Sequence, residues 1–120
     1  MDNKAITRTT DSILTSVKKM VGITEDCTDF DPEIIMHINS ILMTLNQLGV
    51  GPSEGFSIED SQDYWDDFLD DIEQLEAVKT YVGLKVRLIF DPPSSSAVVE
   101  SFNRTISELE WRLNVAAESI

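Results

Sequence analysis

Apolar residues recur at every third or fourth position over most of the chain, and this spacing predicts helices. No segment shows a convincing alternation of apolar and polar residues, so no strand is predicted. The first helix is expected from Asp11 to Val21. Thr10 or Asp11 can cap its start, and Gly22 can end it.

The second predicted helix has the clearest boundaries. Asp31 and Pro32 form a common helix start, in which an N-cap acid precedes a proline at the first helical position. The apolar stripe continues until Gly49. A loop rich in glycine and proline is expected over residues 50–55, because these residues favour turns.

Two longer helical segments follow. One is expected from Ser57 to Phe90, and the acidic pair Asp70-Asp71 is a place where it can break. The double proline at 92–93 ends it, since proline lacks the amide donor and restricts the preceding residue. The last helix is expected from Ser96 to Ala117.

These elements predict an all-α chain, a four-helix bundle-like subunit with a long C-terminal helix and a single domain over residues 1–120. Residues 1–9 are expected to form a flexible N-terminal arm, and residues 115–120 a C-terminal tail. No apolar run is long enough to span a bilayer, and the first residues do not resemble a signal peptide.

Two predicted helices carry apolar side chains outside the single face that would pack against the core. Around Tyr81 a second apolar side, which also includes Leu84 and Leu88, lies about 120–160° from the first. Such a helix is either central to its own fold or packs against another molecule. In the last helix Trp111 lies on the polar side, opposite the apolar stripe, which makes it a candidate interface anchor.

Charge is distributed unevenly along the 120 residues. Nine Lys and Arg stand against 22 Asp and Glu, for a formal net charge of -13. Fifteen of the acids lie between Lys19 and Lys79 without any intervening Lys or Arg. This charge argues against wrapping nucleic acid and against binding anionic lipid. The acidic segment is either a solubilising surface or one that repels DNA or docks onto a basic partner.

The sequence gives little support for catalysis or metal binding. Cys27 and His37 are the only cysteine and the only histidine, so a closed zinc site and a disulfide within the chain are excluded, and a reducing compartment is favoured. The pair Glu73 and Glu76 is typical of magnesium-dependent all-α nucleotide pyrophosphohydrolases, but the second acidic pair that those enzymes need is missing. We therefore expect no enzyme, metal or cofactor.

Two segments together resemble a known family. Tyr81–Ser96 contains the double-proline turn, and Ile106–Asn114 contains Glu-Trp-Arg; jointly they are similar to the small head–tail connector proteins of tailed bacteriophages, also called adaptor or head-completion proteins. The acidic aromatic segment Trp65–Asp71 and the helix start at Asp31 fit the same pattern. The resemblance extends over residues 29–115.

The resemblance implies a subunit that forms a ring, typically of twelve copies, below the portal vertex. The ring would continue the DNA channel without binding DNA specifically and would receive a downstream neck or tail protein. It would be a virion component at the head–tail junction, made in the bacterial cytoplasm. Candidate portal contacts are Glu108, Trp111, Arg112, Val115 and Ile120; candidate subunit contacts are Trp65, Tyr81, Leu84, Lys85, Arg87 and Leu88.

Charge suggests how such copies would meet. A closed ring needs two different complementary patches on each subunit. The acidic segment Glu54–Glu76 beside Lys79, Lys85 or Arg87 of a neighbour would supply them. The alternative function is a small acidic phage-encoded inhibitor that mimics DNA and occupies a basic groove on a host protein.

Overall fold

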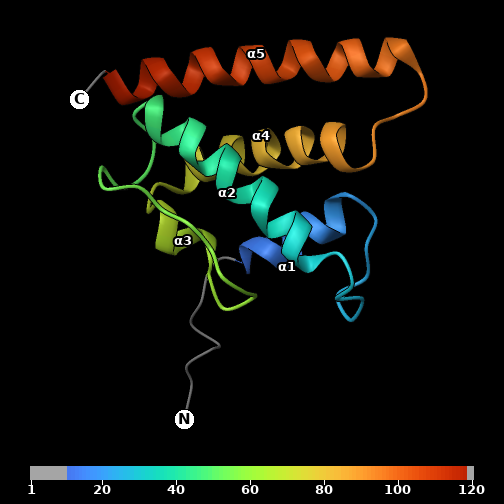
Figure 1. The fold of residues 1–120 in the computed structure, drawn as a ribbon. Helices are drawn as coiled ribbons and strands as arrows, with labels where there is room; N and C mark the ends of the chain where they lie inside the picture. The colour runs from blue at the N-terminus through green and yellow to red at the C-terminus, as the bar shows by residue number, and fades with distance from the viewer. Residues whose placement is uncertain (1–10, 119–120) are drawn as a thin grey trace.

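The computed structural model describes residues 11–118, and all regular elements within this range are helices (Figure 1). They are α1 (Ile13–Met20), α2 (Asp31–Gln47), α3 (Trp65–Phe68), α4 (Ile72–Phe90) and α5 (Ser96–Glu118). The predicted all-α chain with a long C-terminal helix is confirmed. The predicted arm at residues 1–9 and the last two residues of the predicted tail lie outside the described range, whereas residues 115–118 continue α5.

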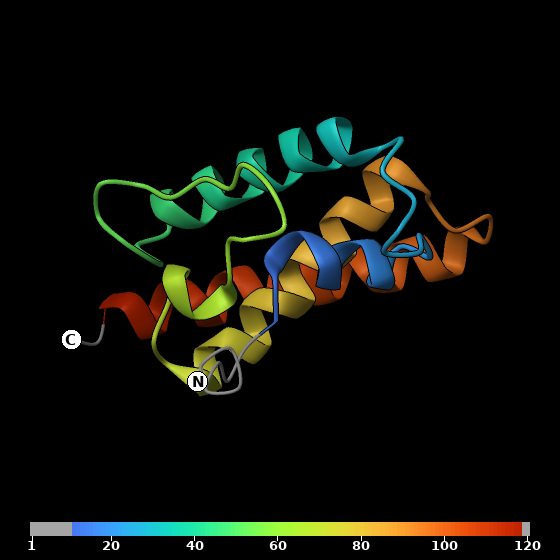
Figure 2. The same ribbon diagram turned by 90° about the horizontal axis from the view of Figure 1, so that it is seen from below.

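Helix α4 occupies the centre of the molecule. It packs against α5 on one side and against α1 and α2 on the other, as the two perpendicular views show (Figures 1 and 2). Its residues Leu75, Val78, Val82 and Val86 are fully buried. The chain thus folds around one central helix, and between residues 11 and 118 five helices, one of them a single turn, replace the four that the sequence predicts.

The predicted helix start at Ser57 is wrong, whereas the break near Asp70-Asp71 is confirmed. Residues 57–64 are irregular because side chains satisfy their backbone groups instead of helical hydrogen bonds. Asn39 of α2 accepts from the Ile58 amide (2.7 Å) and donates to its carbonyl (3.1 Å). Asp63 accepts from the Glu59 amide at 2.8 Å.

Ionic contacts replace a predicted helix cap at the start of α2. Asp31 is the first helical residue and not the N-cap, which is Phe30. The Asp31 carboxylate instead lies 2.9 Å from Nζ of Lys18, a side chain at the end of α1 that is only 3% exposed. Lys18 also donates to the Glu25 carbonyl at 3.0 Å. This buried ion pair joins the end of α1 to the start of α2.

Helix α1 is short but closely packed. Ser12 caps it by accepting from the Thr15 amide at 3.3 Å, in place of the Thr10 or Asp11 cap that the sequence suggests. Where α1 crosses α4, Gly83 leaves room for the Met20 side chain, which a Cβ at this position would overlap. The glycine that weakens α4 therefore permits the close approach of a neighbouring helix.

Candidate assembly surfaces

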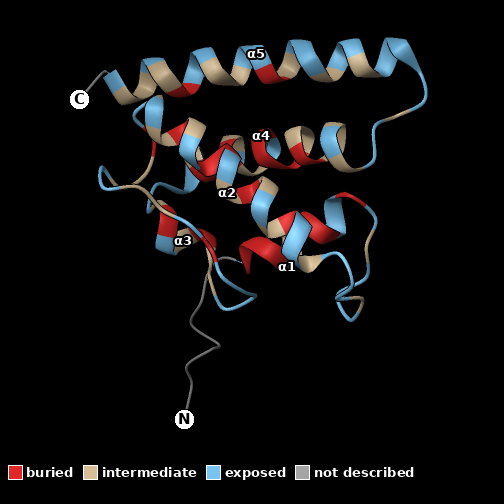
Figure 3. Ribbon diagram, viewed as in Figure 1, coloured by how far each residue is buried: buried red, intermediate tan, exposed pale blue. Residues whose placement is uncertain are grey.

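Helix α5 is covered on one side only. Of its 23 residues, Ile106 and Leu113 are the buried ones, and the outward side of the helix is exposed along its whole length (Figure 3). A helix of this length extends over about 35 Å. It therefore presents a long surface that this subunit does not use for its own core.

Trp111 is the most prominent side chain on that surface. It is 67% exposed, the largest fraction among the described large hydrophobic residues that are exposed. Next to it, Arg112 pairs with Glu108 at 3.0 Å, and both of these side chains are more than half exposed. Val115, one turn further on, is 41% exposed. Four of the five predicted portal-contact residues thus lie on one accessible stretch, and Ile120 lies outside the described residues.

The inward side of α5 is held to α4 by a polar cluster. The buried Tyr81 hydroxyl donates to Oε2 of Glu110 at 2.6 Å, and Lys85 Nζ lies 4.0 Å from the same oxygen and 3.4 Å from the hydroxyl. Burial and the hydrogen bond to Glu110 raise the pKa of the Tyr81 hydroxyl well above its usual range. A further anchor is Asn114, which donates to the Leu48 carbonyl at 3.1 Å.

This cluster explains the second apolar side of α4. Tyr81 is 0% exposed, and Leu84 and Leu88 are partly buried against the core. Because α4 is the central helix, α5 of the same chain covers much of the surface that the sequence leaves open to a neighbour. The predicted subunit contacts at these residues stay predictions, and Tyr81 has no accessible surface to contribute.

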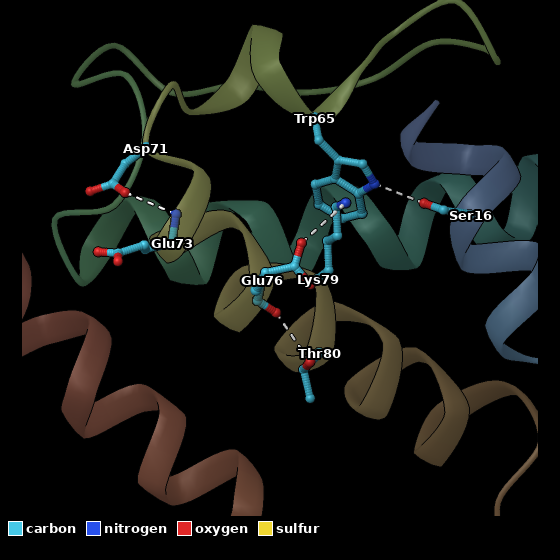
Figure 4. A network of polar contacts seen from close by, with 7 residues as sticks. All are labelled: Ser16, Trp65, Asp71, Glu73, Glu76, Lys79 and Thr80. Atoms are coloured by element: carbon cyan, nitrogen blue, oxygen red, sulfur yellow. Dashed lines mark hydrogen bonds and ion pairs between the residues drawn. The ribbon is translucent and has the colours of Figure 1, made fainter. Parts of the chain in front are cut away.

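Trp65 is likewise satisfied within the chain. Its side chain is 0% exposed, and its indole N–H donates to Oγ of Ser16 at 2.8 Å (Figure 4). A side chain with no exposed surface offers nothing to a neighbour in this conformation, so we do not carry Trp65 into the proposed interface. Its role here is to fix α3 on α1.

The predicted basic patch is also largely engaged inside the chain. Lys79 lies 3.7 Å from Glu76 (Figure 4), and Arg87 lies 3.8 Å from Asp91. Together with Lys85 and Glu110, these pairs offset the cations that were expected to face an acidic neighbour. Charge matching between Glu54–Glu76 and this patch is therefore weaker than the sequence suggests.

An open groove was not anticipated from the sequence. Its volume is about 620 Å³, and it lies between the end of α5, the loop after α2 and the region of α3. Its apolar lining includes Pro52, Phe68 and Ala116, and its acidic side includes Asp70 and Asp71. The loop comes close because Gly51, with φ +88°, lets its backbone lie against the Phe68 ring. No local pattern signals this meeting of three distant segments.

Comparison with known proteins gives one family. A family model described as a phage connector protein matches residues 13–119. The chain belongs to the phage connector protein family. No curated protein and no solved structure matches it significantly.

Membership of the connector family gives the chain a structural rather than an enzymatic role in the phage neck. It implies a place in the virion and association with other proteins of the phage head and tail. Between residues 11 and 118, no cluster of histidine, cysteine and acidic side chains is suited to a metal ion. In the same range, no helix combines the length and apolar character needed to cross a membrane.

The acidic residues of this connector serve two purposes. Some satisfy backbone amides; Asp71, for example, caps α4 by accepting from the amide of Glu73 (Figure 4) and from that of Gln74. Of the fifteen acids between Lys19 and Lys79, all but Asp31, Asp63 and Asp66 are nevertheless exposed. Capping therefore accounts for part of the acidic composition, and the same side chains still give the surface a strong negative charge.

Proposed function

We propose that this connector assembles into a closed ring, of about twelve copies, that joins the portal to the next neck or tail protein and continues the DNA channel. The observation that carries the proposal is the exposed side of α5, which presents Trp111 and Val115 on a helix with only two buried residues. Contiguous exposed apolar side chains of this kind mark contact sites. In a connector, they would be covered on assembly.

The charge of the chain suits a wall along which DNA moves. A net charge of -13 repels phosphates, and the nine Lys and Arg are outnumbered by 22 Asp and Glu, which opposes the binding to DNA that counterion release drives. The genome would therefore pass such a ring without being held. This use of the acidic surface differs from DNA mimicry, in which the same charges would be buried against a basic host protein.

Two partners compete for the exposed end of α5. The family resemblance assigns Glu108, Trp111, Arg112, Val115 and Ile120 to the portal, and a neighbouring copy is the other candidate. Helix α4 would contribute the accessible parts of Leu84, Lys85, Arg87 and Leu88, of which Lys85 lies 4.0 Å from Glu110 of α5. Tyr81, which is fully buried, would act only by holding α5 in place.

Electron microscopy of the chain, with and without the portal protein of the same phage, tests this function. We expect a ring coaxial with the portal, with an open lumen. Some connectors form a ring only after they bind their partner. A monomer in the absence of portal is therefore compatible with the proposal. Particles that never bind the portal, or that bind a basic host protein in its place, would contradict it.

A further inference from the structure

We propose that Trp111 of one copy inserts into the groove beside α3 of the next copy, so that this contact, repeated head to tail, closes the ring. The inference deepens the proposed function and rests on it. It assigns Trp111 to the neighbouring subunit and not to the portal.

The groove has the properties of a socket for an aromatic side chain. A volume of about 620 Å³ lies within the range of pockets that bury a ligand. Its lining includes Pro52, Leu69 and Ala116, which are only partly buried. The Phe68 ring behind them is 3% exposed and packs 5.5 Å from the ring of Phe56, so it supports the groove from within. An indole entering the groove would therefore find apolar contact with its partly exposed lining.

The rim of the groove selects a cation beside the aromatic anchor. Four aspartates line it, Asp66, Asp67, Asp70 and Asp71. Arg112 is the cation next to Trp111 in the sequence, and its side chain is 64% exposed. Its ion pair with Glu108 is exposed as well, so the pair stabilises little and the arginine is free to pair with the aspartates of a neighbouring copy.

The positions of Trp111 and of the groove favour repetition. Leu113, Ala116 and Ala117 line the groove from α5 itself. At about 100° per residue they lie roughly 140–240° around the helix axis from Trp111. The anchor and the socket thus face opposite sides of the same helix end. A contact between two different patches on opposite sides is heterologous, and it generates a ring when the rotation between copies closes.

A mixing experiment tests this contact with the full-length chain. Trp111→Ala removes the anchor, and Ala116→Trp fills the socket. Asp70→Arg is a second socket variant that changes only an exposed side chain and keeps the test valid if the filled socket disturbs folding. Met43→Ala, at an exposed methionine of α2 that is 63% exposed, is the matched control. Assembly is measured by mass photometry in solution, or by microscopy on the portal if the ring forms only there.

Each anchor or socket variant should weaken assembly at least about tenfold, the effect of an anchor residue at an interface, while Met43→Ala assembles normally. An equal mixture of an anchor variant and a socket variant should form dimers and nothing larger. In that dimer, the intact anchor of one chain enters the intact socket of the other, and no further contact is available.

The possible failures are distinguishable. Normal rings from Trp111→Ala would overturn the inference and leave the proposed ring intact. Normal rings that no longer bind the portal would overturn it in favour of a portal contact. If the wild-type chain forms no ring with or without portal, the proposed function itself fails, and the inference fails with it.

Discussion

The buried ion pair between Lys18 and Asp31 leads to an asymmetric prediction. The Lys18 side chain is 3% exposed, whereas that of Asp31 is 22% exposed and lies at the positive end of α2. Replacing Asp31 by Asn leaves a buried ammonium with weaker compensation. Loss of one partner from a buried pair costs about 3–5 kcal/mol. Because the Glu25 carbonyl still accepts from Lys18 at 3.0 Å, we expect the lower end, about 3 kcal/mol.

The reverse substitution should be milder. Lys18→Met keeps the apolar stem and leaves Asp31 partly solvated at a helix N-terminus, where a negative charge is stabilised. We expect a cost of about 1 kcal/mol. The free energy of unfolding of both variants is measured by urea denaturation of the unassembled chain, followed by circular dichroism. In thermal unfolding, the midpoints should fall by about 12 °C for Asp31→Asn and about 4 °C for Lys18→Met.

The double variant completes this cycle. The double variant Lys18→Met with Asp31→Asn should be more stable than the sum of the two single losses predicts. Both replacements are neutral, so the double variant leaves no unpaired charge at this site. Equal costs for the two single variants, or a negligible cost for Asp31→Asn, would refute the reasoning that Lys18 is the more deeply buried partner.

Three further variants probe other contacts. Gly51→Ala should lower the free energy of unfolding by about 3 kcal/mol, because positive φ and overlap with the Phe68 ring both oppose a Cβ. The control Gly55→Ala, with φ +94° and open space, should lower it by only about 1 kcal/mol, and equal losses would contradict the packing argument. Tyr81→Phe should abolish a loss of stability above about pH 10. Burial and the Glu110 bond raise the pKa of the folded hydroxyl, which stays protonated where the unfolded one ionises, so this stability is complete below that pH and decreases as pH rises; an unchanged pH profile would argue that neither burial nor the Glu110 bond raises this pKa. Gly83→Ala should stabilise α4 by up to about 1 kcal/mol only when combined with Met20→Ala, and an equal gain in the wild-type background would show that Met20 does not fill the space.

Helix boundaries were predictable where local signals decide them. The proline after Asp31, the glycine after α2 and the double proline after α4 bracket α2 and end α4 in the structure, within a residue or two of the prediction. Residues 57–64 were not predictable in this way. Ser57 followed three residues later by Asp60 resembles a capping box, which favours a helix. The distant Asn39 overrides this signal by bonding to the Ile58 backbone.

The burial of Trp65 was also not predictable from local sequence, because a distant residue decides it. In the sequence Trp65 is an aromatic residue in an acidic segment. An exposed aromatic residue that anchors an interface can have the same sequence context, so the sequence does not distinguish it from a buried one. The hydroxyl of Ser16, 49 positions away, satisfies its indole N–H and makes burial favourable. The groove was missed for a related reason, since it needs residues from the loop after α2, from α3 and from α5 to be brought together.

Glu110 and Trp111 show how one helix can serve its own fold and an assembly at once. The two side chains leave α5 about 100° apart. Glu110 faces inward and accepts from the buried Tyr81 hydroxyl, which fixes the rotation of α5 about its axis. The same rotation sets Trp111 outward, where it is 67% exposed. A helical wheel leaves the second apolar side of α4 and the tryptophan of α5 without a partner, yet α5 itself covers much of that side of α4. What is left for a partner is the outer side of α5, held in orientation by the contacts on its inner side.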